Sequence, residues 1–361
     1  MRAMIVKEFR QLRRDRRTLA MMILMPVLLL VVLGYAASFD VSQIPTVVAG
    51  PGAATAATAA TAATAASVLP ASFRLAGTYP AAVGGVTPSA WAHDELRDGH
   101  AAVAVVTGTG PGHPGPLILI DGSQLFTAQA ALRALAARHG GQASAPGTVQ
   151  ILYNPQLKTS DIMIPGLAGV ILVFVGTVIT SLGVVRERQA GTLEQLAVMP
   201  LRPADVFLGK VVPYFAVAVL DLAIVLAIGV AVFGVPFRGS AAVFGLGALL
   251  FVFVTLGLGV LISSVSQTQG QAIQLAVMTL LPQVLLSGLI FPLTSIVVGV
   301  RWIAYLLPLT YFTEISRGVM LRAEPISSLW PPFVYLALLG AAVATLATLR
   351  FRAFLAPGTS R

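Results

Sequence analysis

The sequence contains no cysteine and few charged residues. The absence of cysteine among its 361 residues excludes disulfide bonds, thiolate metal ligands and thiol catalysis. Charged residues make up 10% of the chain, whereas a soluble domain has roughly a quarter. Because 57% of the residues are hydrophobic, the composition excludes an ordinary soluble globular protein.

A phosphate-binding loop of the form Gly-x-x-x-x-Gly-Lys-Ser/Thr is also missing. The Gly209-Lys210 pair is followed by Val211 and precedes an apolar run, so it is unsuited to bind ATP phosphates. The spacing of the four histidines matches no zinc motif. We therefore expect no catalytic site, no metal and no cofactor in this chain.

Long apolar runs predict an all-α polytopic membrane protein with six transmembrane helices. Each run approaches the roughly 20 residues that cross about 30 Å of hydrocarbon. The expected spans are residues 19–37, 162–185, 211–233, 241–262, 271–293 and 330–349. Transmembrane helices 2 to 6 thus occupy residues 162–349, and a tail follows at 350–361. Residues 284–309 contain a stretch that is too short and too charged to span, so we expect a re-entrant or interfacial segment there.

Basic residues gather before the first expected span, between the second and third, and after the last. Short loops rich in Lys and Arg stay in the cytoplasm, so both termini are expected there and residues 40–161 outside. The excess of 23 basic over 14 acidic residues is then explained by the orientation of the chain in the membrane. For this reason nucleic acid is not an expected partner.

Residues 40–161 have the pattern of a small α/β domain between helices 1 and 2. Short β-rich runs cover residues 44–49, 101–106 and 117–120, and amphipathic helices are expected at 89–98 and 124–139. Residues 53–66 are a tandem Ala-Ala-Thr repeat, for which a helix and a disordered spacer are both open.

Two cytoplasmic segments have helical patterns. In the loop at residues 186–210, Thr192 and Gln195 have capping-box spacing and Pro200 ends the short helix they would begin. Such a helix suits docking into a partner protein, while a basic loop that only fixes topology is the alternative.

Residues 1–18 have the pattern of an amphipathic helix. Ile5, Phe9 and Leu12 share one helical face, and Arg10, Arg13, Arg14 and Arg17 populate the other. This pattern is typical of a helix at the membrane surface, and it is compatible with simple flanking charge.

Several ordered motifs resemble one family. They are the stretches Arg186–Lys210, Phe233–Ser240, Gln267–Ala272, Leu285–Pro292, Leu307–Phe312 and Arg317-Gly318. Together they resemble ABC-2 type export permeases, in particular the multidrug or daunorubicin-resistance-like branch with a large extracytoplasmic insert. The resemblance implies the ABC-2, or type V exporter-like, fold and a multi-pass protein of a bacterial-type plasma membrane.

The resemblance also implies a function and partners. The chain would be the permease subunit of an ATP-binding cassette exporter that moves an amphiphilic or hydrophobic substrate, such as a drug or lipid, out of the cytoplasm or inner leaflet. Two copies of a separate ATPase subunit would bind ATP and Mg, and a second permease chain, identical or related, would complete the unit. A membrane-anchored sensor or binding protein that works through its external domain is the alternative.

Matching positions give the expected site residues. Residues implied to couple the chain to the ATPase are Arg186, Glu187, Gly191, Thr192, Leu193, Glu194, Gln195, Pro200 and Arg202, and residues 1–18 would form the amphipathic elbow helix. Asp221 is a formal charge near the middle of a span, so it is a candidate for the transport pathway or a helix-packing contact. Ser287 and Gly288 break the fifth span. They are likewise candidates either for the transport pathway or for packing contacts between helices.

Overall fold

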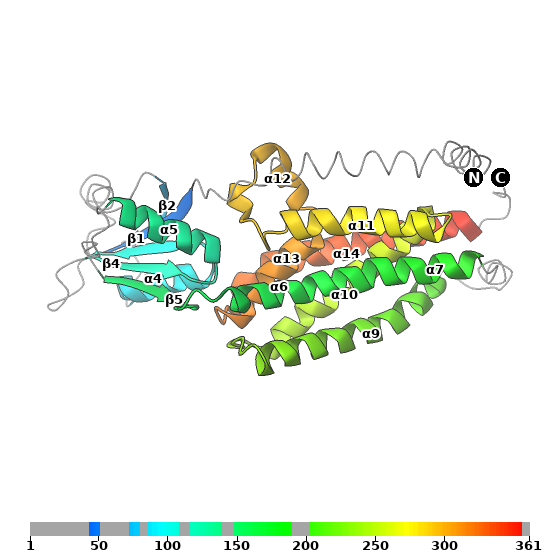
Figure 1. Ribbon diagram of the computed structural model, residues 1–361, viewed down its shortest axis with the longest axis horizontal. Helices are drawn as coiled ribbons and strands as arrows, with labels where there is room; N and C mark the ends of the chain where they lie inside the picture. The colour runs from blue at the N-terminus through cyan, green and yellow to red at the C-terminus, as the bar shows by residue number, and fades with distance from the viewer. Residues whose placement is uncertain are drawn as a thin grey trace, which may run out of the picture.

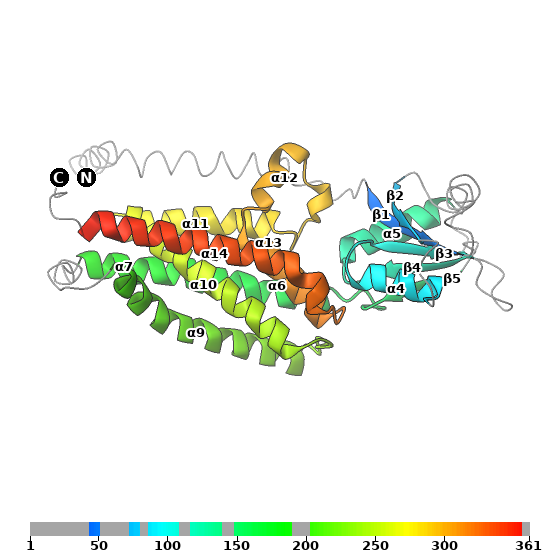
Figure 2. The same cartoon turned by 180° about the vertical axis from the view of Figure 1, so that it is seen from behind.

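The computed structural model describes residues 43–50, 72–79, 86–107, 116–138, 148–189 and 203–355. These residues form a mixed sheet with two helices and an elongated bundle of helices (Figure 1). The sheet lies at one end of the bundle, and the C-terminal end of the last helix lies at the other (Figures 1 and 2).

The sheet has the strand order β2-β1-β3-β4-β5. Its strands are β1 (Ile44–Ala49), β2 (Phe73–Thr78), β3 (Val103–Val106), β4 (Leu117–Asp121) and β5 (Thr148–Leu152). Neighbouring strands are parallel except β3 and β4, which run antiparallel and pair Val103 with Ile120. The central strands are rich in Val, Ile and Leu, which fit a pleated surface covered on both sides.

Helices α4 (Pro88–Arg97) and α5 (Leu125–Arg138) pack against opposite faces of this sheet. Because successive strand residues point to opposite faces, Val105 packs with α5 and its neighbour Ala104 with α4. Both side chains are buried. This two-sided core fixes the position of the end of β4, which carries one of the charged groups described below.

The sheet domain contains the three expected strands and the two expected helices, and adds β2 and β5. Both added strands lie at the edges of the sheet, where one side of the strand has no partner and the hydrophobic pattern is weak. The β2 sequence, Phe-Arg-Leu-Ala-Gly-Thr, is mostly exposed. The Ala-Ala-Thr repeat lies outside the described residues.

The remaining elements form the bundle. They are α6 (Thr159–Val173), η1 (Phe174–Ile179), α7 (Thr180–Gln189), α9 (Pro203–Ala231), α10 (Ala241–Val265), α11 (Gln269–Leu286), η2 (Leu293–Ser295), α12 (Val298–Ala304), α13 (Pro308–Met320) and α14 (Ile326–Leu355). α6, η1 and α7 form one continuous rod in which η1 is a π-helical turn.

Within the described ranges, four helices are long and apolar enough to cross a membrane. They are Thr159–Arg186, Tyr214–Ala231, Ala241–Val265 and Ile326–Arg350. The structure is therefore that of a polytopic helical membrane protein, as the sequence predicts. The expected span at residues 19–37 lies outside the described part, and α11 ends at Leu286 rather than continuing to residue 293.

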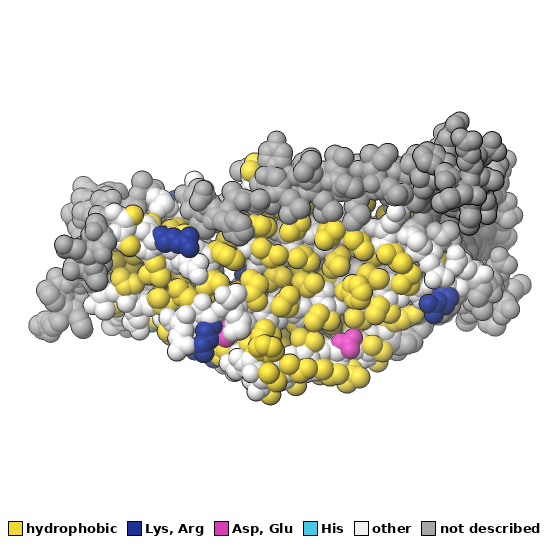
Figure 3. Space-filling view, in the orientation of Figure 1, with side chains coloured by type: hydrophobic (Ala, Val, Ile, Leu, Met, Phe, Trp, Pro, Cys, Tyr) yellow, Lys and Arg dark blue, Asp and Glu magenta, His cyan; other side chains and the backbone are white. Residues whose placement is uncertain are grey.

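The helix α10 forms the centre of the bundle, whereas α9 is peripheral. The α10 side chain of Phe251 is fully buried and stacks on Phe312 of α13, with ring centroids 4.4 Å apart. On α9, by contrast, Leu220 is 60% exposed and Val217 50% exposed. Hydrophobic side chains cover the visible face of the bundle (Figure 3), which is the surface expected of helices that face lipid.

Glycines allow α10 to approach the π-helical turn closely. A Cβ atom at Gly259 would overlap the backbone carbonyl oxygen of Gly176, and it would lie 3.0 Å from Cβ of Thr180. A Cβ atom at Gly176 would lie 2.5 Å from Oγ1 of Thr255. Small residues let membrane helices approach until their backbones touch, so these two glycines set the distance between the two rods.

The segment after α11 lies at the end of the bundle that is next to the sheet domain (Figures 1 and 2). Ser287 caps α11, and Gly288 has φ +81°, a left-handed conformation that favours glycine. The short elements η2 and α12 follow. Pro308 is the first residue of α13, a position where proline needs no N–H partner.

Candidate functional site between the sheet domain and the bundle

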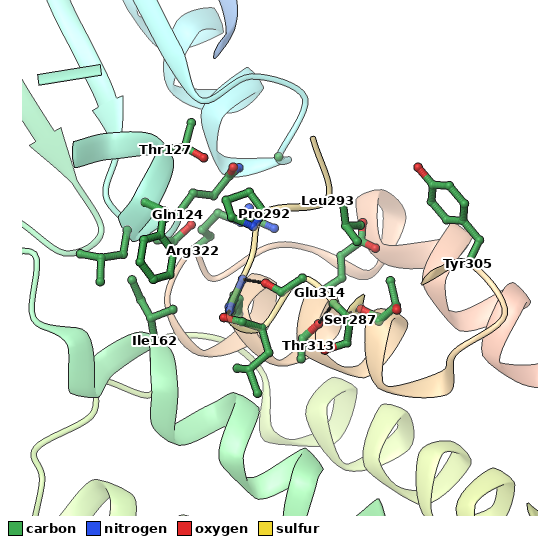
Figure 4. Close-up of a pocket in the computed structure, with 18 residues that line it drawn as sticks. Gln124, Thr127, Ile162, Ser287, Pro292, Leu293, Tyr305, Thr313, Glu314 and Arg322 are labelled. Carbon is green, nitrogen blue, oxygen red and sulfur yellow. Dashed lines mark hydrogen bonds between the residues drawn. The ribbon is translucent and has the colours of Figure 1, made fainter. Parts of the chain in front are cut away.

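A cavity of about 360 Å³ lies between the sheet domain and the end of the bundle (Figure 4). The sheet domain contributes Gln124, in the segment that links β4 to α5, and the first turn of α5, including Thr127. The bundle contributes the start of α6, the segment after α11, one face of α13 and the turn between α13 and α14. Two parts of the protein that are distant in sequence therefore meet around one space.

Arg322, in the turn between α13 and α14, forms ion pairs on both sides of this junction. Its Nη2 atom donates to Oε2 of Glu324 at 2.7 Å, and its Nη1 atom lies 3.7 Å from Oδ2 of Asp121 at the end of β4. The side chains of Arg322, Asp121 and Glu324 are 8%, 0% and 3% exposed. A buried charge is tolerated only where partners and hydrogen bonds compensate it, so these three groups depend on one another.

The backbone of the sheet domain also packs closely against the Arg322 guanidinium. Gly99, in the turn after α4, has φ +73°, and a Cβ atom there would lie 3.2 Å from both terminal nitrogens of Arg322. Asp121 is held by the Ser123 backbone N–H, which donates to its Oδ1 atom at 2.9 Å. Apolar contact among Leu125 of α5, Ile162 of α6 and Leu321 in the turn after α13 also joins the sheet domain to the bundle.

Burial has the largest effect on the pKa values of the two carboxyl groups in this cluster. It raises the pKa of the Asp121 carboxyl above its ordinary value, although the Arg322 guanidinium and the Ser123 hydrogen bonds act in the opposite direction. Burial raises the pKa of Glu324 in the same way, again against Arg322. Burial alone would lower the pKa of Arg322, but the carboxylates of Glu324 and Asp121 outweigh it and the pKa is raised. Arg322 therefore remains charged.

A second arginine fixes the segment after α11. Arg317 of α13 donates from Nη1 to the carbonyl oxygen of Gly288 and from Nη2 to that of Leu289, both at 3.1 Å. Oγ1 of Thr313 donates to the carbonyl oxygen of Ser287 at 3.1 Å. These bonds satisfy the backbone groups freed where α11 ends, so α13 determines the path of the chain along the cavity wall.

Glu314 is the exposed acidic residue of this wall. It lies on α13 between Thr313 and Arg317 and lines the cavity. Among the described residues it makes no hydrogen bond and has no ion-pair partner within 4 Å. Its carboxyl group is therefore available to a molecule in the cavity. Burial raises the pKa of this carboxyl above its ordinary value, while the nearby Arg322 guanidinium lowers it.

The structure brings together two of the residues proposed from the sequence for transport and separates the third. Ser287 and Gly288 both line the cavity, although the Ser287 side chain is 1% exposed. Asp221 is partly buried within the span of α9 and is not among the residues that line the cavity.

The residues proposed for ATPase coupling lie largely outside the described part. Arg186 is exposed in the last turn of α7. The backbone of Glu187 belongs to the same helix, and its side chain is outside the described part. Also outside are Gly191, Thr192, Leu193, Glu194, Gln195, Pro200 and Arg202, together with Ile5, Phe9, Arg10, Leu12, Arg13, Arg14 and Arg17.

The helices that flank this loop are nevertheless described. α7 ends at Gln189, where Oε1 accepts a hydrogen bond of 2.8 Å from Nε2 of Gln269. α9 begins at Pro203. Both ends lie at the end of the bundle remote from the sheet domain (Figures 1 and 2). The loop and the sheet domain are thus attached to opposite ends of the spanning helices.

The sequence analysis did not single out Asp121, Glu314, Arg322 or Glu324. Asp121 follows a buried strand and looks like an ordinary strand end, and its partner is about two hundred residues away in the sequence. A usable signal existed for the others: Glu314, Arg317, Arg322 and Glu324 are clustered in a chain that has few charges.

The fold and the site define a polytopic membrane protein whose spanning helices carry a sheet domain at one end. Its sequence matches the ABC-2 family transporter protein family over residues 16–349, and the chain belongs to this family. The membership confirms the resemblance indicated by the sequence motifs, and it favours a transporter over a membrane-anchored sensor.

Curated relatives include bacterial permeases. The chain is 37% identical over 194 residues to the probable multidrug ABC transporter permease YbhR of Escherichia coli K12. The aligned region covers 53% of each protein. It is 28% identical over 341 residues to the probable multidrug ABC transporter permease YbhS of the same organism, covering 90% of this chain and 89% of the relative. It is 31% identical over 204 residues to the inner membrane transport permease YhhJ, covering 55% and 54%. The match to the first of these spans about half of the relative's length.

Proposed function

We propose that this chain is the permease subunit of an ATP-binding cassette exporter. The observation that carries the proposal is the family match across residues 16–349, which includes all four candidate spans except the last residue of the fourth. The names of the relatives, which include multidrug ABC transporter permeases, support an amphiphilic or hydrophobic substrate that leaves the cytoplasm or inner leaflet.

The proposed complex contains two permease chains and two ATPase subunits. ATP and Mg would be bound by the ATPase subunits, since the sequence lacks a phosphate-binding loop. The second permease chain is either identical or related in sequence. In this proposal the permease itself performs no bond-breaking chemistry and alternates between states that nucleotide on its partner determines.

We infer that the loop between α7 and α9 docks on the ATPase. Arg186, Glu187, Gly191, Thr192, Leu193, Glu194 and Gln195 would form the coupling segment, and Pro200 and Arg202 would shape the turn that follows it. The flanking helix ends lie away from the sheet domain (Figure 1), and this separation supports opposite sides of the membrane for the two.

The full proposed topology has six transmembrane helices with both termini in the cytoplasm. Residues 19–37 and the α11 region would add two spans to the four candidates, and the elbow helix would lie on the membrane surface before the first span. Basic residues in the loop at residues 186–210 support its cytoplasmic location. The sheet domain would then face the extracytoplasmic side of a bacterial-type plasma membrane.

The ATPase partnership can be tested by charge reversal in the loop. The tagged full chain is purified from host membranes, the copurifying subunit with a phosphate-binding loop is identified by mass spectrometry, and the complex is reconstituted in liposomes. Glu194→Lys and Arg202→Glu are expected to reduce copurification or to uncouple ATP hydrolysis from transport. The control, Arg97→Glu, reverses an exposed charge in the sheet domain and should retain both activities. If both loop variants retain the ATPase and coupled transport, the docking assignment is wrong.

A further inference from the structure

The cavity at the junction has both apolar and polar walls. Phe126, Leu289 and Leu293 contribute hydrophobic surface, while Gln124, Thr127 and Glu314 contribute polar groups. A volume of about 360 Å³ lies within the range of about 300–1,000 Å³ that small-molecule sites occupy. A ligand that fits these walls must itself be amphiphilic.

The charged groups around the cavity differ in their partners. Three carboxylates, of Asp121, Glu314 and Glu324, accompany the two guanidinium groups of Arg317 and Arg322. Arg322 is shared by Asp121 and Glu324, and both terminal nitrogens of Arg317 donate to backbone carbonyls. Glu314, the exposed member of the group, has no hydrogen-bond or ion-pair partner among the described residues, and Arg322 acts on it only at longer range.

An anionic ligand would find few free donors in the same place. The Nε atoms of Arg317 and Arg322 have no hydrogen-bond partner, but both atoms are buried in the packed wall and have no accessible surface toward the cavity. Among the described charged groups that line the cavity, Glu314 is exposed, Arg317 is half-buried and Arg322 is buried. A positively charged ligand can form an ion pair with Glu314 and would favour its ionised form, whereas the terminal nitrogens of both arginines already have partners within the protein.

We propose that this junction cavity binds monovalent amphiphilic cations. The Glu314 carboxylate contacts the cationic group, and Phe126, Leu289 and Leu293 contact the apolar part. The inference deepens the proposed export function and rests on it for the origin of the ligand. Binding itself requires only the permease chain, since every one of these residues belongs to it.

The test uses the full chain in phosphatidylcholine nanodiscs. The probes are tetraphenylphosphonium and tetraphenylborate, which have the same shape and opposite charge, and the binding of each to empty nanodiscs is subtracted. The wild-type chain is expected to bind tetraphenylphosphonium saturably. Because Glu314→Gln removes one ion pair from a partly enclosed site, it should weaken this binding by about tenfold.

Two further variants keep the test decisive. Glu314→Asp retains the charge and is expected to retain most of the affinity. Glu95→Gln removes a carboxylate that pairs with His100 and does not line the cavity, so its affinity should equal that of the wild type. Thermal unfolding of each variant verifies that the chain is folded.

Three results would overturn the proposal: no saturable binding of tetraphenylphosphonium to the wild-type chain, unchanged affinity in folded Glu314→Gln, or tetraphenylborate binding that equals that of the cation. Its failure is distinguishable from failure of the export function. A chain that copurifies with its ATPase but does not bind the cation contradicts the site alone, and a chain that binds the cation without any ATPase partner contradicts the exporter alone.

Discussion

Arg322 Nη1 lies 3.7 Å from Oδ2 of Asp121, and this pair joins the turn between α13 and α14 to the end of the sheet strand β4. Asp121 belongs to the sheet domain and Arg322 to the helical bundle, and both side chains are buried. The ion pair therefore links the sheet domain directly to the helical bundle. Glu324 completes the cluster by accepting a hydrogen bond from Arg322.

Replacing Arg322 by methionine should destabilise the junction. Arg322→Met leaves the Asp121 and Glu324 carboxylates buried without a counter-charge, and such a change costs about 3–5 kcal/mol. The expected result is a lower thermal unfolding midpoint and faster hydrogen exchange in β4. The matched control is Arg97→Met, which breaks partly exposed pairs with Asp94 and Asp98 and should cost less than about 1 kcal/mol. Equal shifts in the two variants would contradict a special role for the buried cluster.

The destabilisation by Arg322→Met should depend on pH. A carboxyl whose pKa is raised by folding stabilises the folded state below its unfolded pKa, and this contribution is lost as the pH rises through the folded value. Folding raises the pKa of Asp121 and Glu324 by burial even with Arg322 present, and removing the arginine that lowers both should raise them further.

The stability deficit of Arg322→Met relative to the wild type is therefore expected to be small near about pH 4–5 and to grow toward about pH 8. Unfolding midpoints across this range measure it. The Arg97→Met deficit, from exposed groups, should vary much less over the same range. A deficit of Arg322→Met that is constant with pH would show that the carboxylates are not its cause.

Helix spacing should depend on Gly259. In Gly259→Ala the new Cβ atom would overlap the carbonyl oxygen of Gly176, so α10 must move away from η1 at a cost of about 1–3 kcal/mol. Gly245→Ala is the control within α10, since nothing lies within 4 Å of its added Cβ atom. We expect a lower unfolding midpoint for Gly259→Ala and no loss for Gly245→Ala. The packing assignment fails if the two variants unfold at the same temperature.

The spanning helices could be predicted because their signal is local. The run at residues 241–262 is apolar throughout and corresponds to α10, which needs no information from elsewhere in the chain. Likewise, the short runs rich in β-branched and aliphatic residues identify the central strands before their partners are known. The edge strands β2 and β5 escaped prediction because their residues are partly exposed and their pairing supplies the missing stabilisation.

The site illustrates the limit of local patterns. Ser287 and Gly288 could be proposed because serine and glycine interrupt an apolar run, and they line the cavity. Glu314 could not be assigned a role from its position, since its importance depends on which neighbouring charges are already paired. Arg317 and Arg322 have partners in other segments, and no sequence period indicates those partners.

By itself, the sequence determined that the chain is a polytopic helical membrane protein with an α/β insert, because long hydrophobic runs and short β-rich runs indicate burial locally. Only the tertiary structure decided that Asp121 meets Arg322 and that Glu314 remains unpaired among the described residues beside a cavity. The physical reason is that ion pairing and cavity formation depend on distances between segments far apart in the chain, and those distances exist only after the sheet domain has packed against the bundle.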